Sequence, residues 1–321
     1  MIQFWKRKMV IVAGGAGFIG HHLVRALREA KASVHVIDNF TTGDRSRLER
    51  LRRSEGERIT VQHQDIALPA VLPAADVIFN LASPASPVHY QSNPIQTWKS
   101  NVLGTLTLLD HAIGCGARLV QASTSEIYGE PLSHPQKETD WGNVNPVGPR
   151  ACYDESKRAA EALLMDAVRT ADADIRIARI FNTYGPGMNA DDGRVIPNFI
   201  AQAQADEPLT IHGDGNQTRS FCYVSDTVDG LMRLAALDAA RGEIVNLGNP
   251  HEMTIRQIAT TINQKFRRAD NVILRPRPAD DPSRRCPDTT KARHLLAWQP
   301  TISFEQGLHR MVTDAPIKAS A

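Results

Sequence analysis

Three glycines at a fixed spacing constrain the fold of this chain more than any other feature. They lie in the stretch Gly14-Gly15-Ala16-Gly17-Phe18-Ile19-Gly20, which directly follows the apolar run at 9–13. The apolar run predicts a buried strand, and the helical periodicity of residues 21–30 predicts a helix after the glycines. A strand, a glycine turn and a helix in this order are typical of the start of a dinucleotide-binding βαβ unit.

A second apolar run, at 33–37, ends at Asp38, where such a unit carries an acidic residue. Gly14 would permit the tight turn, Gly17 would let the backbone approach a pyrophosphate, and Gly20 would let the helix pack closely on the strand. The helix N-terminus would supply amide donors to the phosphates. A carboxylate at Asp38 binds ribose hydroxyls and repels a 2′-phosphate, which favours NAD over NADP. Two arginines lie close enough in sequence to leave NADP open: Arg45 and Arg47.

Composition favours a globular enzyme. The chain has 321 residues, 42% of them hydrophobic, and a net charge of +2, so neither size nor charge suggests a nucleic-acid partner. The four cysteines are scattered and have neither disulfide-framework nor metal-ligand spacing, so we expect no metal. No apolar run approaches the ~18 residues that would suggest a membrane span. We therefore expect a cytoplasmic protein without a membrane partner.

Strands and helices alternate through the first half of the chain. Further strands are predicted at 59–61, 77–80, 118–121 and 175–178, and helices at 93–114 and 153–170. This alternation predicts an α/β fold, a Rossmann-type doubly wound parallel sheet with a smaller C-terminal substrate-binding lobe. We expect the NAD-binding domain at 1–181, with segments around 220–250 returning to it, and the lobe mainly at 182–321.

Tyr153 and Lys157 form a candidate catalytic pair. They lie one helical turn apart, so both side chains should share one face of the predicted helix. A neighbouring ammonium favours phenolate and would lower a tyrosine pKa that is ordinarily ~10. A tyrosine with this neighbour can act as a general base at a nicotinamide cofactor.

The glycine loop together with Tyr153-x-x-x-Lys157 resembles the extended short-chain dehydrogenases/reductases that act on nucleotide sugars, over nearly the whole chain. Four segments are similar in particular to UDP-glucuronate decarboxylases (UDP-xylose synthases): 81–87, 141–155, 179–186 and 280–282. The resemblance implies oxidation at C4 of the sugar, with Tyr153 taking the hydroxyl proton while hydride passes to NAD. The C4 ketone then lies β to the C6 carboxylate, so CO2 can leave without a metal, and re-reduction gives UDP-xylose.

The tripeptide Thr124-Ser125-Glu126 should lie at the end of the strand predicted at 118–121. By resemblance, Thr124 bonds the C4 oxygen. Related sugar 4,6-dehydratases carry Asp-Glu where this chain has Ser125-Glu126, and serine is a poor acid for dehydration. Glu126 would be protonated or held by a cation, for which Arg285 is the candidate, either binding the carboxylate or serving proton delivery at C5. Glu126 could instead be structural, and Arg285 a surface residue beside Arg284.

The resemblance implies further binding residues. Cofactor contacts are expected at Gly14, Gly17, Phe18, Ile19, Gly20, Asp38, Asn39, Asp65, Ile66, Leu81, Ala82, Ser83, Tyr153 and Lys157. Substrate contacts are expected at Lys99, Asn101, Asn182, Arg194, Thr210, Gln217, Arg219 and Arg285, although Lys99 could instead be an exposed helix residue. The resemblance also implies a homodimer through a four-helix interface, with weak support from Val102, Leu106 and Leu109.

Three readings stay open at the level of the sequence. The first is decarboxylation of UDP-glucuronate to UDP-xylose. The second is release of the UDP-4-keto-pentose with NADH, or a related 4,6-dehydratase or C4-epimerase activity. The third is an NAD-binding sensor without catalysis, which the presence of Thr124, Tyr153 and Lys157 together disfavours.

Overall fold

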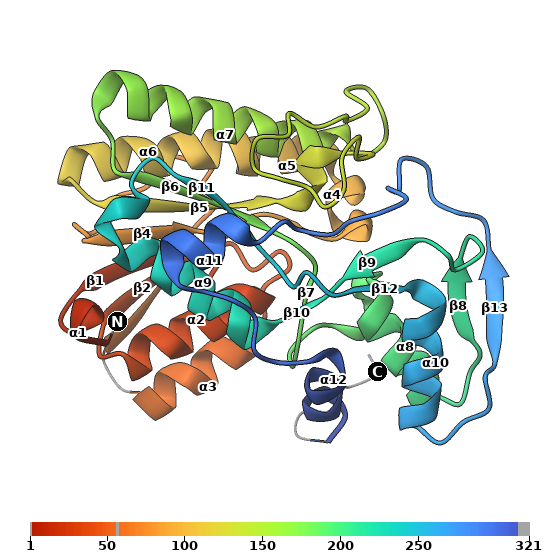
Figure 1. The fold of residues 1–321 in the computed structure, drawn as a ribbon. Helices are drawn as coiled ribbons and strands as arrows, with labels where there is room; N and C mark the ends of the chain where they lie inside the picture. The colour runs from red at the N-terminus through yellow and green to blue at the C-terminus, as the bar shows by residue number, and fades with distance from the viewer. Residues whose placement is uncertain (1, 56–57, 314–321) are drawn as a thin grey trace.

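A seven-stranded, fully parallel sheet forms the centre of the molecule (Figure 1). The computed structural model describes residues 2–55 and 58–313. The strand order is β11-β6-β5-β4-β1-β2-β3, which confirms the predicted doubly wound α/β class. The strands are β1 (Met9–Ala13), β2 (Ser33–Asp38), β3 (Ile59–His63), β4 (Val77–Asn80), β5 (Arg118–Thr124), β6 (Ile175–Ile180) and β11 (Ile244–Leu247).

Both faces of the sheet are apolar, because successive side chains of a strand point to opposite sides. Val10 and Val12 of β1 belong to one core cluster, whereas Ile11 and Ala13 belong to another. Helices α2 (Phe18–Glu29), α3 (Arg45–Glu55) and α9 (Val224–Ala236) cover the first face. Helices α6 (Gly104–Cys115) and α7 (Ala151–Ala171) cover the second, so the near-continuous apolar character of β1 follows from its burial on both sides.

Two predicted boundaries differ from the structure. Strand β5 does not end near Gln121 but continues to Thr124, because β6 also continues to Ile180 and pairs with these residues. The predicted helix 93–114 is three consecutive segments: α5 (Pro94–Trp98), the π-helical η2 (Lys99–Leu103) and α6. Asn93 begins this series by accepting a hydrogen bond from the Gln96 amide.

A smaller group of elements lies beside the carboxyl ends of the strands, at the right of Figure 1. Helices α8 (Val195–Gln204) and α10 (Ile255–Lys265) pack together there, next to the parallel pair β8 (Leu209–His212) and β13 (Val272–Arg275). Strand β9 (Thr218–Ser220) pairs antiparallel with β12 (Glu252–Thr254). The chain crosses between sheet and lobe repeatedly, since α9, β11 and α11 (Thr290–Leu296) pack with the sheet. The domain boundary at residue 181 stays a prediction.

The remaining elements are short or peripheral. They are α1 (Ile2–Trp5), α4 (Pro87–Ser92), η3 (Ser125–Tyr128), β7 (Thr183–Tyr184), η4 (Ala190–Asp192), β10 (Cys222–Tyr223), η5 (Asp238–Ala240) and α12 (Phe304–Thr313). Among the described residues, no helix combines the length and apolarity that crossing a membrane requires.

Two glycines of the loop, Gly14 and Gly20, cannot be replaced by a residue with a side chain without strain. Gly14 adopts a φ of +77°, which L-residues with a Cβ disfavour. A Cβ on Gly20 would lie 2.1 Å from the carbonyl oxygen of Gly14, which is backbone and has no rotamer to change. The close approach of α2 to the turn after β1 therefore requires glycine.

We expect Gly20→Ala to lower the free energy of unfolding by about 1–3 kcal/mol, the usual cost of overpacking, and to weaken NAD binding. Gly114→Ala is the matched control, because nothing lies within 4 Å of the added Cβ and alanine favours a helix by about 0.5–1 kcal/mol. Thermal melts and NAD titration would measure both variants. Equal stability of Gly20→Ala and wild type would contradict this account of the loop.

Candidate active site

A cavity of about 770 Å³ opens where the glycine loop, the end of β5 and the start of α7 meet the lobe. Ligands of open α/β sheets bind at the carboxyl ends of the strands, beside the point where strand order reverses. Here that reversal lies between β1 and β4. The cavity volume is in the range of small-molecule and cofactor sites.

Most of the predicted cofactor residues line this cavity. They are Gly14, Gly17, Phe18, Ile19, Gly20, Leu81, Ser83, Tyr153 and Lys157. The other five do not line it: Asp38, Asn39, Asp65, Ile66 and Ala82. Asn39 donates to Asp65 at 3.4 Å, and Gln96 donates to the same carboxylate oxygen at 2.8 Å.

Asp38 is held at the glycine loop. One carboxylate oxygen accepts from the Ala16 amide at 2.9 Å and the other from the Phe40 amide at 2.8 Å. Burial raises the pKa of Asp38, and these two amides oppose that effect. The two arginines that left NADP open each have a partner in the protein: Arg47 lines the cavity and donates to the Gly187 carbonyl at 2.9 Å, and Arg45 lies over the Phe40 ring.

Tyr153 and Lys157 both line the cavity from the first turns of α7. The Lys157 ammonium donates to the Ala122 carbonyl at 3.0 Å and lies 5.8 Å from the centroid of the Tyr153 ring. Burial raises the pKa of Tyr153, and the side-chain hydrogen bond with Thr124 only partly opposes it. Burial also lowers the pKa of Lys157 to about 8. The expected lowering of the tyrosine pKa is therefore wrong for the protein without ligands, because desolvation outweighs the interactions that favour phenolate.

Tyr90 stacks on Tyr153, with ring centroids 4.9 Å apart and planes inclined by 6°. Both rings are buried together with Cys152. Tyr90 lies in α4, and no periodicity in the sequence pairs it with α7. The stack fixes the plane in which the Tyr153 hydroxyl can reach a substrate.

Glu126 is the centre of a buried ionic network. Its two oxygens accept from Arg285 at 2.7 Å and from Arg150 at 3.1 Å. Burial alone would raise the pKa of Glu126, but the two guanidinium groups hold it below its ordinary value. Arg150 also donates to Asp281 at 3.2 Å, and Asp281 accepts from Arg219 at 2.9 Å. Glu126 is thus ionised and paired, and the interpretation of Arg285 as a surface residue is wrong.

Three guanidinium groups and two carboxylates of the network line the cavity, and Arg277, outside the cavity, is a fourth guanidinium 3.8 Å from Asp281. The network therefore carries an excess positive charge before any ligand binds. Arg285 is 6% exposed, and its Nη2 has no hydrogen-bond partner among the described residues. A buried donor without a partner is costly, so the site is suited to an incoming anion.

Six of the predicted substrate residues line the cavity: Asn182, Arg194, Thr210, Gln217, Arg219 and Arg285. Two do not. Lys99 is exposed, because it lies on the outer side of η2. Asn101 is buried and donates to Ser156 of α7 at 2.8 Å, so it joins two helices.

Sequence reasoning missed the roles of Arg150 and Asp281 in the ionic network. Arg150 immediately precedes α7, and Asp281 follows the lobe strand β13. Both stand in segments that carry the resemblance, yet no spacing predicts that residues so far apart would meet. The charged residues within those two segments were the one feature of the sequence that could have indicated a role in the site.

The sheet, the glycine loop and the tyrosine–lysine pair define a class of protein, the nicotinamide-dinucleotide enzymes that oxidise or reduce a hydroxyl-bearing carbon. The sequence profile described as "NAD dependent epimerase/dehydratase family" matches residues 10–248. The chain belongs to this family, whose cofactor is NAD.

Within this family, the chain is similar to proteins that are named as UDP-glucuronic acid decarboxylases. UDP-glucuronic acid decarboxylase 2 of Arabidopsis thaliana is 51% identical over 96% of this chain and 69% of its own length. UDP-glucuronic acid decarboxylase 1 of Xenopus tropicalis is 46% identical over 95% of this chain and 72% of its own. Among solved structures, the epimerase Mth375 of Methanothermobacter thermautotrophicus superposes with a TM-score of 0.88 at 32% identity, covering 96% and 92% of the two chains.

A further solved structure carries the cofactor. DesIV, a dTDP-glucose 4,6-dehydratase of Streptomyces venezuelae with NAD bound, superposes with a TM-score of 0.85 at 29% identity, covering 94% of this chain and 95% of its own. Epimerases and dehydratases therefore share this fold, and the sheet alone does not separate their reactions.

Asp154 gives a pH-dependent test of the network. Burial, followed by the charge of Glu126, raises the pKa of Asp154 from 3.8 to about 8. A raised pKa means that the folded state binds the proton more tightly, so this stabilisation is full below about pH 4 and is lost as the pH rises through about 8. We expect Asp154→Asn to gain stability relative to wild type over that window. Urea unfolding at several pH values measures it, with the exposed Asp110→Asn as control. A difference independent of pH would contradict the assignment.

Proposed function

We propose that this chain converts UDP-glucuronate to UDP-xylose and CO2 with NAD as a recycled cofactor. The observation that carries the proposal is Arg285, a buried guanidinium on the cavity wall whose Nη1 donates to Glu126 and whose Nη2 has no partner in the part of the chain that the structure describes. A cavity lined by such a donor and by Tyr153 suits a sugar that carries a carboxylate. The relatives named as UDP-glucuronic acid decarboxylases support the same substrate.

The cofactor would be held by the glycine loop, Asp38 and Lys157. The tight turn at Gly14 and the close packing of α2 at Gly20 would place the N-terminus of α2 at the pyrophosphate, and Asp38 is fixed by the amide of Ala16 beside that turn. When bound, NAD supplies the reversible oxidation of a substrate carbon. Lys157, whose pKa burial lowers to about 8, would orient the cofactor ribose.

Tyr153 would remove and return the C4 hydroxyl proton. Thr124 shares a side-chain hydrogen bond with it, and stacking on Tyr90 restricts the ring. Since burial keeps Tyr153 protonated in the protein alone, its activation depends on the charges that arrive with the ligands. The stacking and the hydrogen bond thus position Tyr153, and ligand binding would lower its pKa so that it can act as a base.

Arg285 and Ser125 would manage the substrate carboxylate. In a C4 ketone of glucuronate the carboxylate is β to the carbonyl, so the electrons of the breaking C5–C6 bond pass into an enolate and no metal is needed. Arg285 would hold the carboxylate, and Ser125 would donate a hydrogen bond without adding repulsion. Glu126 is paired with Arg285 and Arg150 and would stay ionised, so its role would be to position Arg285.

The nucleotide would occupy the lobe side of the cavity. Arg219 is buried, and its one carboxylate partner is Asp281 at 2.9 Å. Arg194 is paired with Asp192, near the Phe18 ring. Both arginines line the cavity and suit a pyrophosphate.

The direct test is incubation with UDP-glucuronate and NAD, with CO2, NADH and the sugar product followed together. We expect CO2 and UDP-xylose without net NADH. CO2 with stoichiometric NADH would instead indicate release of the UDP-4-keto-pentose. Binding of NAD by the wild-type protein without any turnover would contradict an enzyme.

We expect Tyr153→Phe to abolish turnover while NAD binding stays near that of wild type, since only the phenolic oxygen is removed.

The carboxylate assignment has a matched pair of variants. Arg285→Ala should raise the activation barrier for UDP-glucuronate by about 2–5 kcal/mol, the usual cost of truncating one partner of a buried charge pair. The adjacent Arg284→Ala removes an exposed guanidinium and should leave kcat/KM unchanged. Steady-state kinetics with NAD binding as a folding control compare the two. Equal kinetics for both variants would contradict the role of Arg285.

We further propose a cytoplasmic homodimer. Helices α5, η2 and α6 expose the apolar side chains Ile95, Trp98, Leu103, Leu106 and Ile113, which would pack against a second copy. Leu109, expected on this face from the sequence, is instead buried in the core against the sheet.

The cysteines support the cytoplasmic location. All four are free thiols, as in a reducing compartment.

A further inference from the structure

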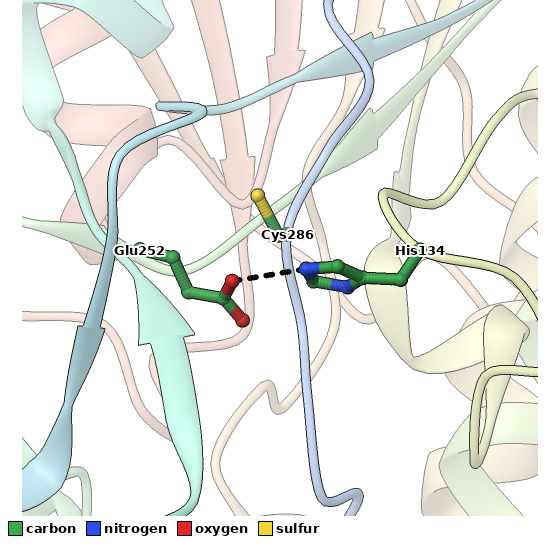
Figure 2. A group of neighbouring side chains, drawn as sticks. All are labelled: His134, Glu252 and Cys286. Atoms are coloured by element: carbon green, nitrogen blue, oxygen red, sulfur yellow. Dashed lines mark hydrogen bonds and ion pairs between the residues drawn. The ribbon is translucent and has the colours of Figure 1, made fainter.

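Three side chains of metal-binding type meet outside the cavity (Figure 2). They are His134, Glu252 and Cys286, and they come from a loop, from β12 and from the segment after β13. His134 Nε2 lies 2.9 Å from Glu252 Oε2, and the candidate ligand atoms of all three lie within 4.8 Å of one another. No pair among them has the sequence spacing of a metal motif, so the tertiary structure alone brings them together.

We propose that His134, Glu252 and Cys286 bind a divalent ion of the zinc class. Imidazole, carboxylate and thiolate are the ligand types that zinc uses, whereas Mg²⁺ and Ca²⁺ prefer oxygen alone. Bonds of about 2.0–2.3 Å around a tetrahedral ion place ligand atoms roughly 3.3–3.8 Å apart. The His134–Glu252 separation of 2.9 Å is shorter than that range, and every separation in the cluster is at most 4.8 Å, so small side-chain movements would bring the three atoms to tetrahedral distances.

The neighbours of the three residues support ligation. Glu252 Oε1 accepts from the Thr218 hydroxyl, which leaves Oε2 directed toward His134. The Cys286 amide donates to the Gln136 side chain at 2.8 Å, and the Gln136 amide donates to the Cys286 carbonyl at 2.9 Å. Such outer hydrogen bonds orient metal ligands.

The charges and access also suit an ion. Cys286 is buried, but the side chains of His134 and Glu252 are 31% and 24% exposed, which gives a route from solvent and a fourth position for water. The sulfur donates to the Pro250 carbonyl at 3.3 Å, as a protonated thiol does. Binding would replace the S–H bond by an S–metal bond and release one proton. The thiolate and the carboxylate then balance the charge of the ion.

The site lies next to the proposed active centre without being part of it. Cys286 follows Arg285 in the chain, and β12 pairs with β9 at Arg219. An ion would therefore join three segments and hold two of them beside cavity arginines. Its role is structural, because none of its ligands lines the cavity.

The test uses chelator-treated full-length protein and the metal ions alone. We expect one Zn²⁺ per chain, a rise in the melting temperature with Zn²⁺, and no effect of Mg²⁺. Co²⁺ in the same site should give a thiolate-to-metal charge-transfer absorption. Cys286→Ser should abolish that absorption, and His134→Ala should weaken Zn²⁺ binding at least about tenfold.

Cys115→Ser is the matched control, because Cys115 is a half-buried free thiol of α6 outside the cluster and should leave Co²⁺ absorption unchanged. His134 is exposed, so His134→Ala remains informative even if Cys286→Ser unfolds. Absence of Zn²⁺ binding in wild type would overturn the proposal. So would binding that neither His134→Ala nor Cys286→Ser weakens. These readouts are independent of the decarboxylation assay.

Discussion

The buried carboxylate of Glu126 is the interaction on which the cavity depends. It accepts hydrogen bonds from Arg285 and Arg150 at once, and Arg150 links it through Asp281 to Arg219. These residues come from the end of β5, the start of α7, β9 and the segment after β13, so one ionic network joins the sheet to the lobe. Removing one partner from a buried pair typically costs 3–5 kcal/mol, which makes the network structural as well as functional.

In the Tyr153–Lys157 pair, burial raises the pKa of the tyrosine, whereas proximity to an ammonium alone would lower it. Tyr153 is stacked, buried and protonated, and Lys157 is buried and bonded to a backbone carbonyl. The protein thus provides position and exclusion of water, while the charges of the ligands would decide when the phenol releases its proton. A base that is inactive without ligand fits a reaction in which the redox step only prepares another bond cleavage.

The residues after β5 distinguish this chain within a fold that epimerases and dehydratases share. Ser125 and Glu126 begin η3 at the carboxyl end of a central strand, where side chains reach the cavity. With Ser125 uncharged and Glu126 fully paired, the excess positive charge of the network is directed to a ligand. The common sheet supplies the cofactor site, and under the proposed function these few positions would decide what can be done to the oxidised sugar.

The sequence by itself determined the parallel sheet, the glycine loop and the Tyr153–Lys157 face, because each follows from local periodicity or fixed spacing. It also indicated Arg285 and Glu126, through segments similar to a known family. Only the tertiary structure decided that Arg150 and Asp281 complete their network, that Lys99 is outside the cavity, and that His134, Glu252 and Cys286 meet. Such contacts join residues far apart in the chain, and burial, which sets the pKa of Tyr153, is a property of the packed molecule.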